Sequence, residues 1–302
     1  MRSTILILFF VLNVVSLRAQ KEDASLKKKL ELLTTGFRGK VGIYVHHLKT
    51  GRTVSINADT LFPTASMIKV PLTIGVFDRI EKGELDYRGE LIYRDSLLYE
   101  GVDILGSFKD GEKIELSKLL MLMVTMSDNT ASLWCQTLAG GGTVINEWLD
   151  QNGFVYTRVN SRTPGREQHR SRYGWGQTTP REMAGLVQRI REGKVISPRV
   201  SERIYRNMTN IYWDSYCLSM IPPYVQTASK QGAVDESRSE VVMVNAPHGD
   251  YVFCVITKDQ EDQSWTRENA GFVLLRNISS VIWAHFEPSH PWTPSENIHE
   301  WR

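Results

Sequence analysis

The sequence predicts an α+β fold in which both ends of the chain supply strands to one antiparallel sheet and the middle forms helices. Alternation of apolar and polar residues, typical of half-buried strands, occurs near residues 41–56 and again near residues 225–257. Between about residues 64 and 208 the apolar residues recur with helical spacing. Because sheets and helices bury their apolar sides against each other, we expect an α/β sandwich with an all-helical subdomain and a cleft between the two parts.

The first twenty residues have the composition of a signal peptide. Arg2 supplies positive charge, Ile5–Val15 is apolar, and Ser16–Ala19 ends in small residues. The apolar run is shorter than the roughly 20 residues that cross a bilayer. We therefore expect cleavage near residue 19 or 20 and an exported protein, periplasmic or secreted, with no membrane contact afterwards. A retained anchor is the alternative.

The elements of the mature chain follow in order. An amphipathic helix is predicted over residues 23–36, and an antiparallel hairpin is predicted from Val41–Val45 and Thr53–Ile56. The clearest later segments are helices at 116–124, 130–138, 144–149 and 181–190, strands at 225–229, 241–245 and 251–257, and a closing helix at 266–286. The expected organisation is a signal peptide at 1–20, one domain at 21–286 (sheet part about 21–60 and 210–286, helical subdomain about 61–209) and an irregular tail at 287–302.

Composition favours a soluble globular protein that acts on small molecules. Apolar residues make up 41% of the chain, and the formal net charge of +2 comes from interspersed charges. This pattern offers no surface for nucleic acid, and a monomer is expected. The seven histidines contain no HExxH or comparable pair, so neither a metal nor a cofactor is predicted. An odd number of cysteines excludes a complete disulfide framework, so we expect mostly buried thiols at Cys135, Cys217 and Cys254.

Ser66 and Lys69 are the first candidate catalytic pair. Three residues apart on a helical turn, a hydroxyl and an amine share one face. Phe62–Pro63 interrupts the chain just before them, and Pro71 is tolerated only near a helix start. Ser66 is thus expected at a helix N-terminus, which favours negative charge. Alone the pattern is weak, because Ser25 and Lys28 repeat it and a serine can simply cap a helix.

Two further polar motifs lie downstream. Ser127-Asp128-Asn129 falls at the junction of two helical patterns, and Lys230-Gln231-Gly232-Ala233 ends an apolar strand pattern. Taken together and in this order, the three motifs resemble the SxxK, SDN and KTG motifs of the class A β-lactamases, and the resemblance covers residues 25–286. Lys49-Thr50-Gly51 matches the KTG motif literally, but it precedes Ser66 and its Thr-Gly pair is typical of the turn of a hairpin.

The resemblance implies a role for each matched residue. Ser66 would be acylated, Lys69 would assist its deprotonation, and Ser127 would pass a proton to the leaving nitrogen. Backbone N–H groups of Ser66 and Ala233 would hold the oxyanion. The residues expected to contact substrate are Asn129, Lys230, Gln231, Ala233 and Arg238, with Gln231 replacing the family's hydroxyl residue and Arg238 supplying compensating charge.

One loop departs from the family pattern. Alignment without gaps puts Thr163 where the family has its deacylating glutamate, and we expect Thr163 to line the substrate site. Glu167 stands where the family has an asparagine that helps hold the hydrolytic water. We hypothesise that Glu167 activates this water. The alternative is that Glu167 pairs with neighbouring arginines or solvent.

Three functions are compatible with these motifs. The first is hydrolysis of the β-lactam amide through an acyl-enzyme on Ser66. The second is acyl transfer or hydrolysis on another substrate, such as a cell-wall peptide or an ester, by the same groups. The third is a penicillin-binding protein that stalls as the acyl-enzyme, or recognises cell-wall fragments without chemistry.

Overall fold

The computed structural model describes residues 21–101 and 103–301. The signal peptide predicted for residues 1–20 therefore lies outside the described residues. In the described ranges, no helix has the length and apolar character needed to cross a bilayer.

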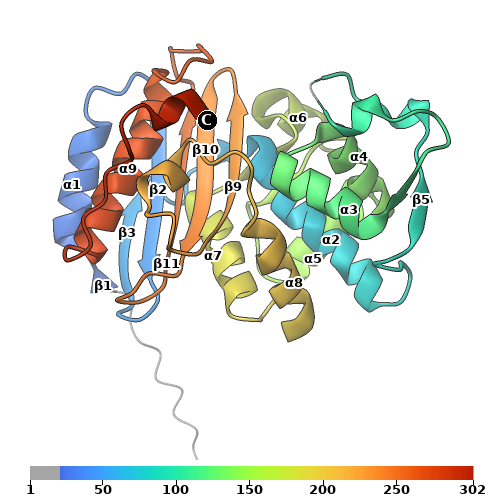
Figure 1. Ribbon diagram of the computed structural model, residues 1–302, viewed down its shortest axis with the longest axis horizontal. Helices are drawn as coiled ribbons and strands as arrows, with labels where there is room; N and C mark the ends of the chain where they lie inside the picture. The colour runs from blue at the N-terminus through green and yellow to red at the C-terminus, as the bar shows by residue number, and fades with distance from the viewer. Residues whose placement is uncertain (1–20, 102, 302) are drawn as a thin grey trace, which may run out of the picture.

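A six-stranded sheet organises the described chain, and both ends of the chain supply its strands (Figure 1). In spatial order these are β1 (Lys21–Glu22), β3 (Arg52–Ile56), β2 (Lys40–His47), β11 (Tyr251–Lys258), β10 (Ser237–Val244) and β9 (Thr227–Val234). The predicted α+β class is confirmed. The expectation of a purely antiparallel sheet needs correction, because β1 pairs parallel with β3 as the chain enters the first helix.

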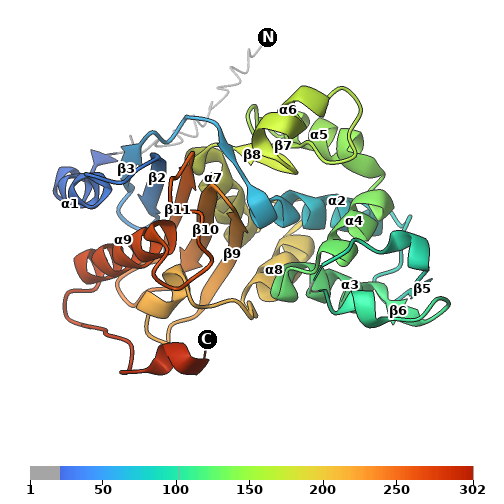
Figure 2. The ribbon, with the colours of Figure 1, turned by 90° about the horizontal axis from the view of Figure 1, so that it is seen from above.

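Helices cover both faces of the sheet. On one face lie α1 (Ala24–Thr34) and α9 (Ala270–Phe286), and on the other lie α7 (Pro180–Arg191) and, at the β9 end, α8 (Pro198–Met208) (Figure 2). Strand alternation accounts for this arrangement, since Val242 packs with the α1–α9 core while Val241 packs with the core of the helical part. Helix α9 begins four residues later than predicted because the Asn269 side chain caps it.

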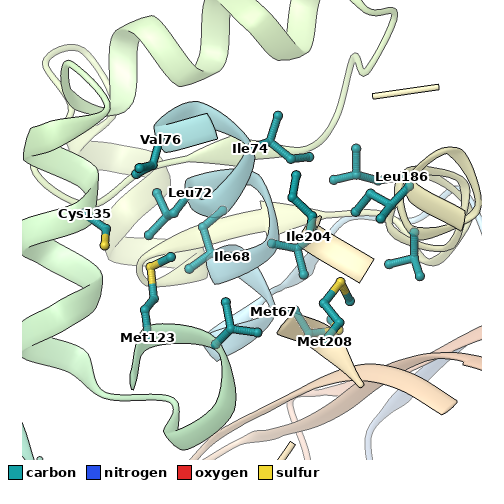
Figure 3. Close-up of a cluster of buried hydrophobic side chains, with 14 of the residues drawn as sticks. Met67, Ile68, Leu72, Ile74, Val76, Met123, Cys135, Leu186, Ile204 and Met208 are labelled. Carbon is teal, nitrogen blue, oxygen red and sulfur yellow. The ribbon is translucent and has the colours of Figure 1, made fainter. Parts of the chain in front are cut away.

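The helical part is built around α2 (Lys69–Glu81), whose buried residues reach all round the helix. Figure 3 shows Met123 and Cys135 on one side of α2 and Ile204 and Met208 on the other. The remaining helices are α3 (Leu116–Met121), a π-helical turn (Leu122–Met126), α4 (Asn129–Leu138), α5 (Gly141–Gln151) and α6 (Glu167–Tyr173), with 3₁₀ turns at Ala65–Ile68, Asp95–Leu97, Leu105–Ser107, Cys217–Met220 and Ile298–Trp301.

Short strands interrupt the helical part, and the sequence analysis missed them. They are β4 (Phe62–Pro63), β5 (Glu90–Ile92), β6 (Lys113–Glu115), β7 (Arg158–Val159) and β8 (Gly176–Thr178). Two or three residues are too few to show a period-two pattern, so alternation could not reveal them. The cysteine prediction is confirmed, since the thiols of Cys135, Cys217 and Cys254 are free and buried.

Candidate active site

Ser66 lies where a 3₁₀ turn leads into the central helix α2. The preceding residue, Ala65, has a φ of 43°, in the left-handed region that a residue with a Cβ rarely adopts. Such strain persists only where surrounding packing enforces it, and it is common at functional sites. Because α2 is buried all round, the half-buried Ser66 is presented from a rigid support.

The Lys69 amine is the centre of a polar cluster. Its Nζ donates hydrogen bonds to Ser66 Oγ at 3.1 Å, to Ser127 Oγ at 3.0 Å and to Asn129 Oδ1 at 2.8 Å. The side chain is completely buried. Burial lowers the pKa of Lys69 to about 7, against the opposing pull of the Asp103 and Asp128 carboxylates. Near neutral pH this amine can therefore accept a proton from a neighbouring hydroxyl.

Ser127 is placed by an irregular helix end. The π-helical turn stops at Met126, and Ser127 follows with a φ of 60°. Asp128 then caps α4 by accepting a hydrogen bond from Ala131 N at 2.7 Å. This break between helices turns the Ser127 hydroxyl toward Lys69, and π-helical turns often mark such sites.

The third motif enters from β9, the edge strand of the sheet. Lys230 Nζ donates to Ser127 Oγ at 3.1 Å and to Gln231 Oε1 at 2.8 Å. Burial, reinforced by the Lys69 charge, holds the pKa of Lys230 well below its usual range. At Gly232 a Cβ atom would lie 2.9 Å from Ser66 N and 2.6 Å from a neighbouring carbonyl oxygen. Only glycine lets β9 pack this closely beside the nucleophile.

Two cavities, of about 440 and 690 Å³, meet at Ser66, Asn129 and Ala233. Each cavity is lined by residues of both the sheet and the helical part. The first is flanked by Tyr99 and Trp175, whose rings meet edge to face at 5.1 Å. The second adds the exposed rings of Trp213 and Trp265, the half-buried ring of Tyr216, and the cationic side chains of Arg267 and Arg276. This is the predicted cleft, with room for a small molecule next to the Ser66 hydroxyl.

Arg238 was expected to bind substrate, and its position corrects that expectation. The residue is fully buried, and its guanidinium donates to the carbonyl oxygens of Val234 and Ser264. The guanidinium also lies 4.6 Å from the centroid of the Trp265 ring and 4.5 Å from that of Phe272. Arg238 thus supports the wall of the second cavity from behind and does not line it.

Thr163 and Glu167 are likewise not brought to the cavities. Thr163 is buried against Gly142 at the start of α5, and its hydroxyl donates to Ser161 O at 2.9 Å. Glu167 is exposed at the first turn of α6, where its carboxylate accepts a hydrogen bond from Gly165 N at 3.1 Å. The expectation that Thr163 lines the substrate site is therefore wrong, and the position of Glu167 fits the alternative of a solvated carboxylate.

Arg267 and Arg276 were missed by the sequence analysis. Arg276 lies one helical turn after Phe272 on α9, and both line the second cavity with Gln231. An arginine that follows an aromatic residue at helical spacing could have signalled a cationic edge on the apolar face of this helix.

Comparisons with known proteins agree with this geometry. A model of the beta-lactamase enzyme family matches residues 25–286. Beta-lactamase VEB-1 of Pseudomonas aeruginosa is 20% identical over 93% of this chain and 96% of its own, and Beta-lactamase SME-1 of Serratia marcescens is 24% identical over 65% and 66%.

Among solved structures, a variant of PBP-A captured as an acyl-enzyme complex with penicillin G has a TM-score of 0.80 and 24% identity, covering 90% of this chain and 100% of that one. A β-lactamase from Sphaerobacter thermophilus has a TM-score of 0.76 and 22% identity, covering 88% and 98%. With the family model spanning most of the chain, we conclude that the protein belongs to the beta-lactamase enzyme family and is a hydrolase of the class A type.

Proposed function

We propose that the protein opens the β-lactam amide of penicillin-type and cephalosporin-type compounds through an acyl-enzyme on Ser66. One observation carries this proposal: Ser66, Lys69, Ser127 and Lys230 converge in one crevice, linked by hydrogen bonds of 3.0–3.1 Å. A hydroxyl, a buried amine and a relay hydroxyl are the groups that acyl transfer to serine requires.

In the proposed first step, neutral Lys69 takes the Ser66 proton as the Ser66 oxygen attacks the lactam carbonyl. In this proposal the oxyanion accepts hydrogen bonds from the backbone N–H groups of Ser66 and Ala233, and the close approach of Gly232 to Ser66 N supports this arrangement. As the C–N bond breaks, Ser127 gives its proton to the lactam nitrogen and regains one from Lys69. The step ends with an ester on Ser66, and the proton of Ser66 has in effect passed through Lys69 and Ser127 to the lactam nitrogen.

The negative charge of β-lactam substrates also fits this site. Penicillins and cephalosporins carry a carboxylate, and the second cavity offers the guanidinium groups of Arg267 and Arg276 beside Gln231. Arginine is suited to carboxylates because its planar donors can bind both oxygens. We infer that these arginines hold the substrate carboxylate, taking the role that the sequence analysis assigned to Arg238.

A second candidate function is a penicillin-binding protein that stalls after acylation. The observation in its favour is the position of Glu167, which is exposed at the start of α6 and lines neither cavity at Ser66. Without a carboxylate to activate water, the ester would be released slowly. A PBP-A variant similar in fold was captured as such an acyl-enzyme. Activity on a cell-wall peptide or ester remains the third possibility.

A turnover assay combined with intact-mass measurement separates these functions. The protein is mixed with a chromogenic cephalosporin for rate and with penicillin G for mass, beside the Ser66→Ala variant. Steady turnover supports the hydrolase, and an equimolar burst followed by a persistent adduct supports the stalled enzyme. Absence of both colour and adduct would contradict action on β-lactams and leave the peptide or ester as substrate.

We further propose that the chain is exported, periplasmic or secreted, and acts as a monomer on small molecules. The support is the signal-peptide composition of residues 1–20. N-terminal sequencing of protein recovered from the periplasm or the medium tests this proposal, with a new terminus near residue 20 as the expected result. An intact first residue in the membrane fraction would instead indicate a retained anchor.

A further inference from the structure

Two imidazoles and a carboxylate meet at the end of the sheet farthest from Ser66. His248 lies in the turn between β10 and β11, while Glu287 and His290 directly follow α9. One ring nitrogen of each histidine and one oxygen of Glu287 all lie within 4.8 Å of one another. Strand β11 begins three residues after His248 and ends at Lys258 beside the first cavity, a length of about 24 Å for seven steps of about 3.4 Å.

Glu287 is an unusual residue for this place because its carboxylate is completely buried. One oxygen accepts a hydrogen bond from the His248 backbone N–H at 2.9 Å, and the other lies 2.5 Å from His248 Nδ1 and 3.4 Å from His290 Nδ1. A buried charge needs a compensating charge nearby. A divalent cation held between this carboxylate and the two imidazole nitrogens would supply that charge.

We propose that His248, Glu287 and His290 form a zinc site. Two imidazole nitrogens and one carboxylate oxygen are a common zinc ligand set, and three protein ligands leave a fourth position for water. Zn²⁺ would lie between the imidazole nitrogens and the carboxylate oxygen that already face one another. The ligand atoms must then separate slightly, which the half-exposed side chains of His248 and His290 allow.

The surroundings already orient these ligands. Trp283 on α9 donates its indole N–H to His290 O at 2.7 Å, which fixes the turn that carries His290. The backbone N–H of His248 holds the second oxygen of Glu287, so the first remains directed at the imidazoles. Outer contacts of this kind raise metal affinity by setting ligand orientation in advance.

A bound zinc ion would join the β10–β11 turn to the residues after α9. It would therefore stabilise the attachment of the tail that begins at residue 287, without contact to Ser66. The sequence analysis found no ligand pair because His248 and His290 lie on segments far apart in the chain and Glu287 precedes its histidine by three residues. The fold brings them together.

The test uses untagged, chelator-treated protein titrated with ZnCl₂ against a competing dye, followed by thermal melting with and without Zn²⁺. One equivalent should bind and raise the melting temperature. His248→Ala and Glu287→Gln should each weaken binding at least about 100-fold, since even outer-shell changes cost roughly 10–100-fold. His169→Ala, a histidine on α6, is the matched control and should leave binding unchanged.

Folding of each variant is checked by its rate of adduct formation at Ser66, which the proposal leaves unaffected. Anomalous diffraction at the zinc edge should then place one ion between His248 and Glu287. Absence of saturable zinc binding by the wild-type chain would overturn the proposal. Equal binding by His248→Ala, or equal loss in His169→Ala, would also overturn it by showing adventitious binding to surface histidines.

Discussion

The crevice at Ser66 and the loop between β7 and β8 differ in how their polar side chains are used. In the crevice, side chains from α2, the α3–α4 junction and β9 bond to one another across long sequence separations, as in Lys69–Ser127 and Lys230–Ser127. In the loop, the side chains around Glu167 bond mostly within the loop and its flanking strand: Glu167 accepts from Gly165 N, and Arg166 and His169 both bond to Gln177. The groups that form an ester are thus built into the core, whereas Glu167, the group expected to hydrolyse it, is exposed and bonds to the backbone of its own loop.

This difference teaches that acylation and ester release are separable parts of the fold. Groups fixed by several elements cannot move without disturbing the core, so acylation is expected of any chain that keeps them. A carboxylate on a surface loop can be lost or turned outward at little cost in stability. Each of the following changes tests one side of this contrast.

The largest effect is expected from Ser66→Ala. Removing the nucleophile should lower β-lactam turnover by about 10⁴-fold or more, since triad-type sites lose most of their rate with the nucleophile. Intact-mass measurement with penicillin G should show no adduct. Circular dichroism should be unchanged, because Ser66 is half-buried and the substitution is small. An adduct in this variant would place the nucleophile elsewhere.

The next effect is a pH dependence set by Lys69. Burial lowers its pKa to about 7, so the amine is charged below this pH and neutral above it. Only the neutral form accepts the Ser66 proton, and the acylation rate should therefore rise about tenfold per pH unit below 7 and level off above it. Stopped-flow measurement of the acylation rate between pH 5 and 9 tests this. In Lys69→Ala the inflection should vanish, and its survival would assign the base to another group.

A smaller effect is expected from Arg276→Ala. Loss of a charged hydrogen bond of about 1.5–3 kcal/mol should raise KM for penicillin G about tenfold or more, with little change in kcat. Arg172→Ala is the matched control, because Arg172 lines only the first cavity. Steady-state kinetics of both variants provide the comparison. An equal rise in KM for both would indicate general electrostatic attraction and not a specific carboxylate contact.

The smallest effect is expected from Glu167→Gln. Because the side chain is exposed and bonds within its own loop, the lifetime of the acyl-enzyme should change less than about twofold. The decay of the penicillin G adduct, followed by mass spectrometry, measures this lifetime. A lengthening of tenfold or more would show that Glu167 reaches the hydrolytic water, and the contrast between crevice and loop would then fail.

Sequence reasoning succeeded where local geometry decides the outcome. The spacing of Ser66 and Lys69 on one helical turn, and the end of a strand at Lys230, follow from helix and strand periods. It failed where direction depends on the rest of the fold. The gapless alignment predicted where Thr163 and Glu167 lie in the loop, but it did not predict the orientation of their side chains. Thr163 packs against Gly142, and Glu167 lies in the first turn of α6.

Arg238 illustrates the same limit on a strand. Arg238 pairs in register with Ala233, which borders both cavities. Its backbone therefore lies near the site, as its short distance in sequence from the third motif suggested. Alternation nevertheless turns its side chain to the face that α9 covers, where Trp265 and Phe272 enclose the guanidinium. The cationic edge of the site comes from α9 and the segment before it, which no local pattern connects to Ser66.

The most direct measurement is the location of the adduct formed with penicillin G. The protein is mixed with penicillin G, quenched in acid within seconds, digested and mapped by tandem mass spectrometry. The expected result is one added penicillin molecule, attached through an ester to Ser66. Attachment to Ser127 or to any other residue, or absence of an adduct at every quench time, would contradict the role of the crevice as an acylation site.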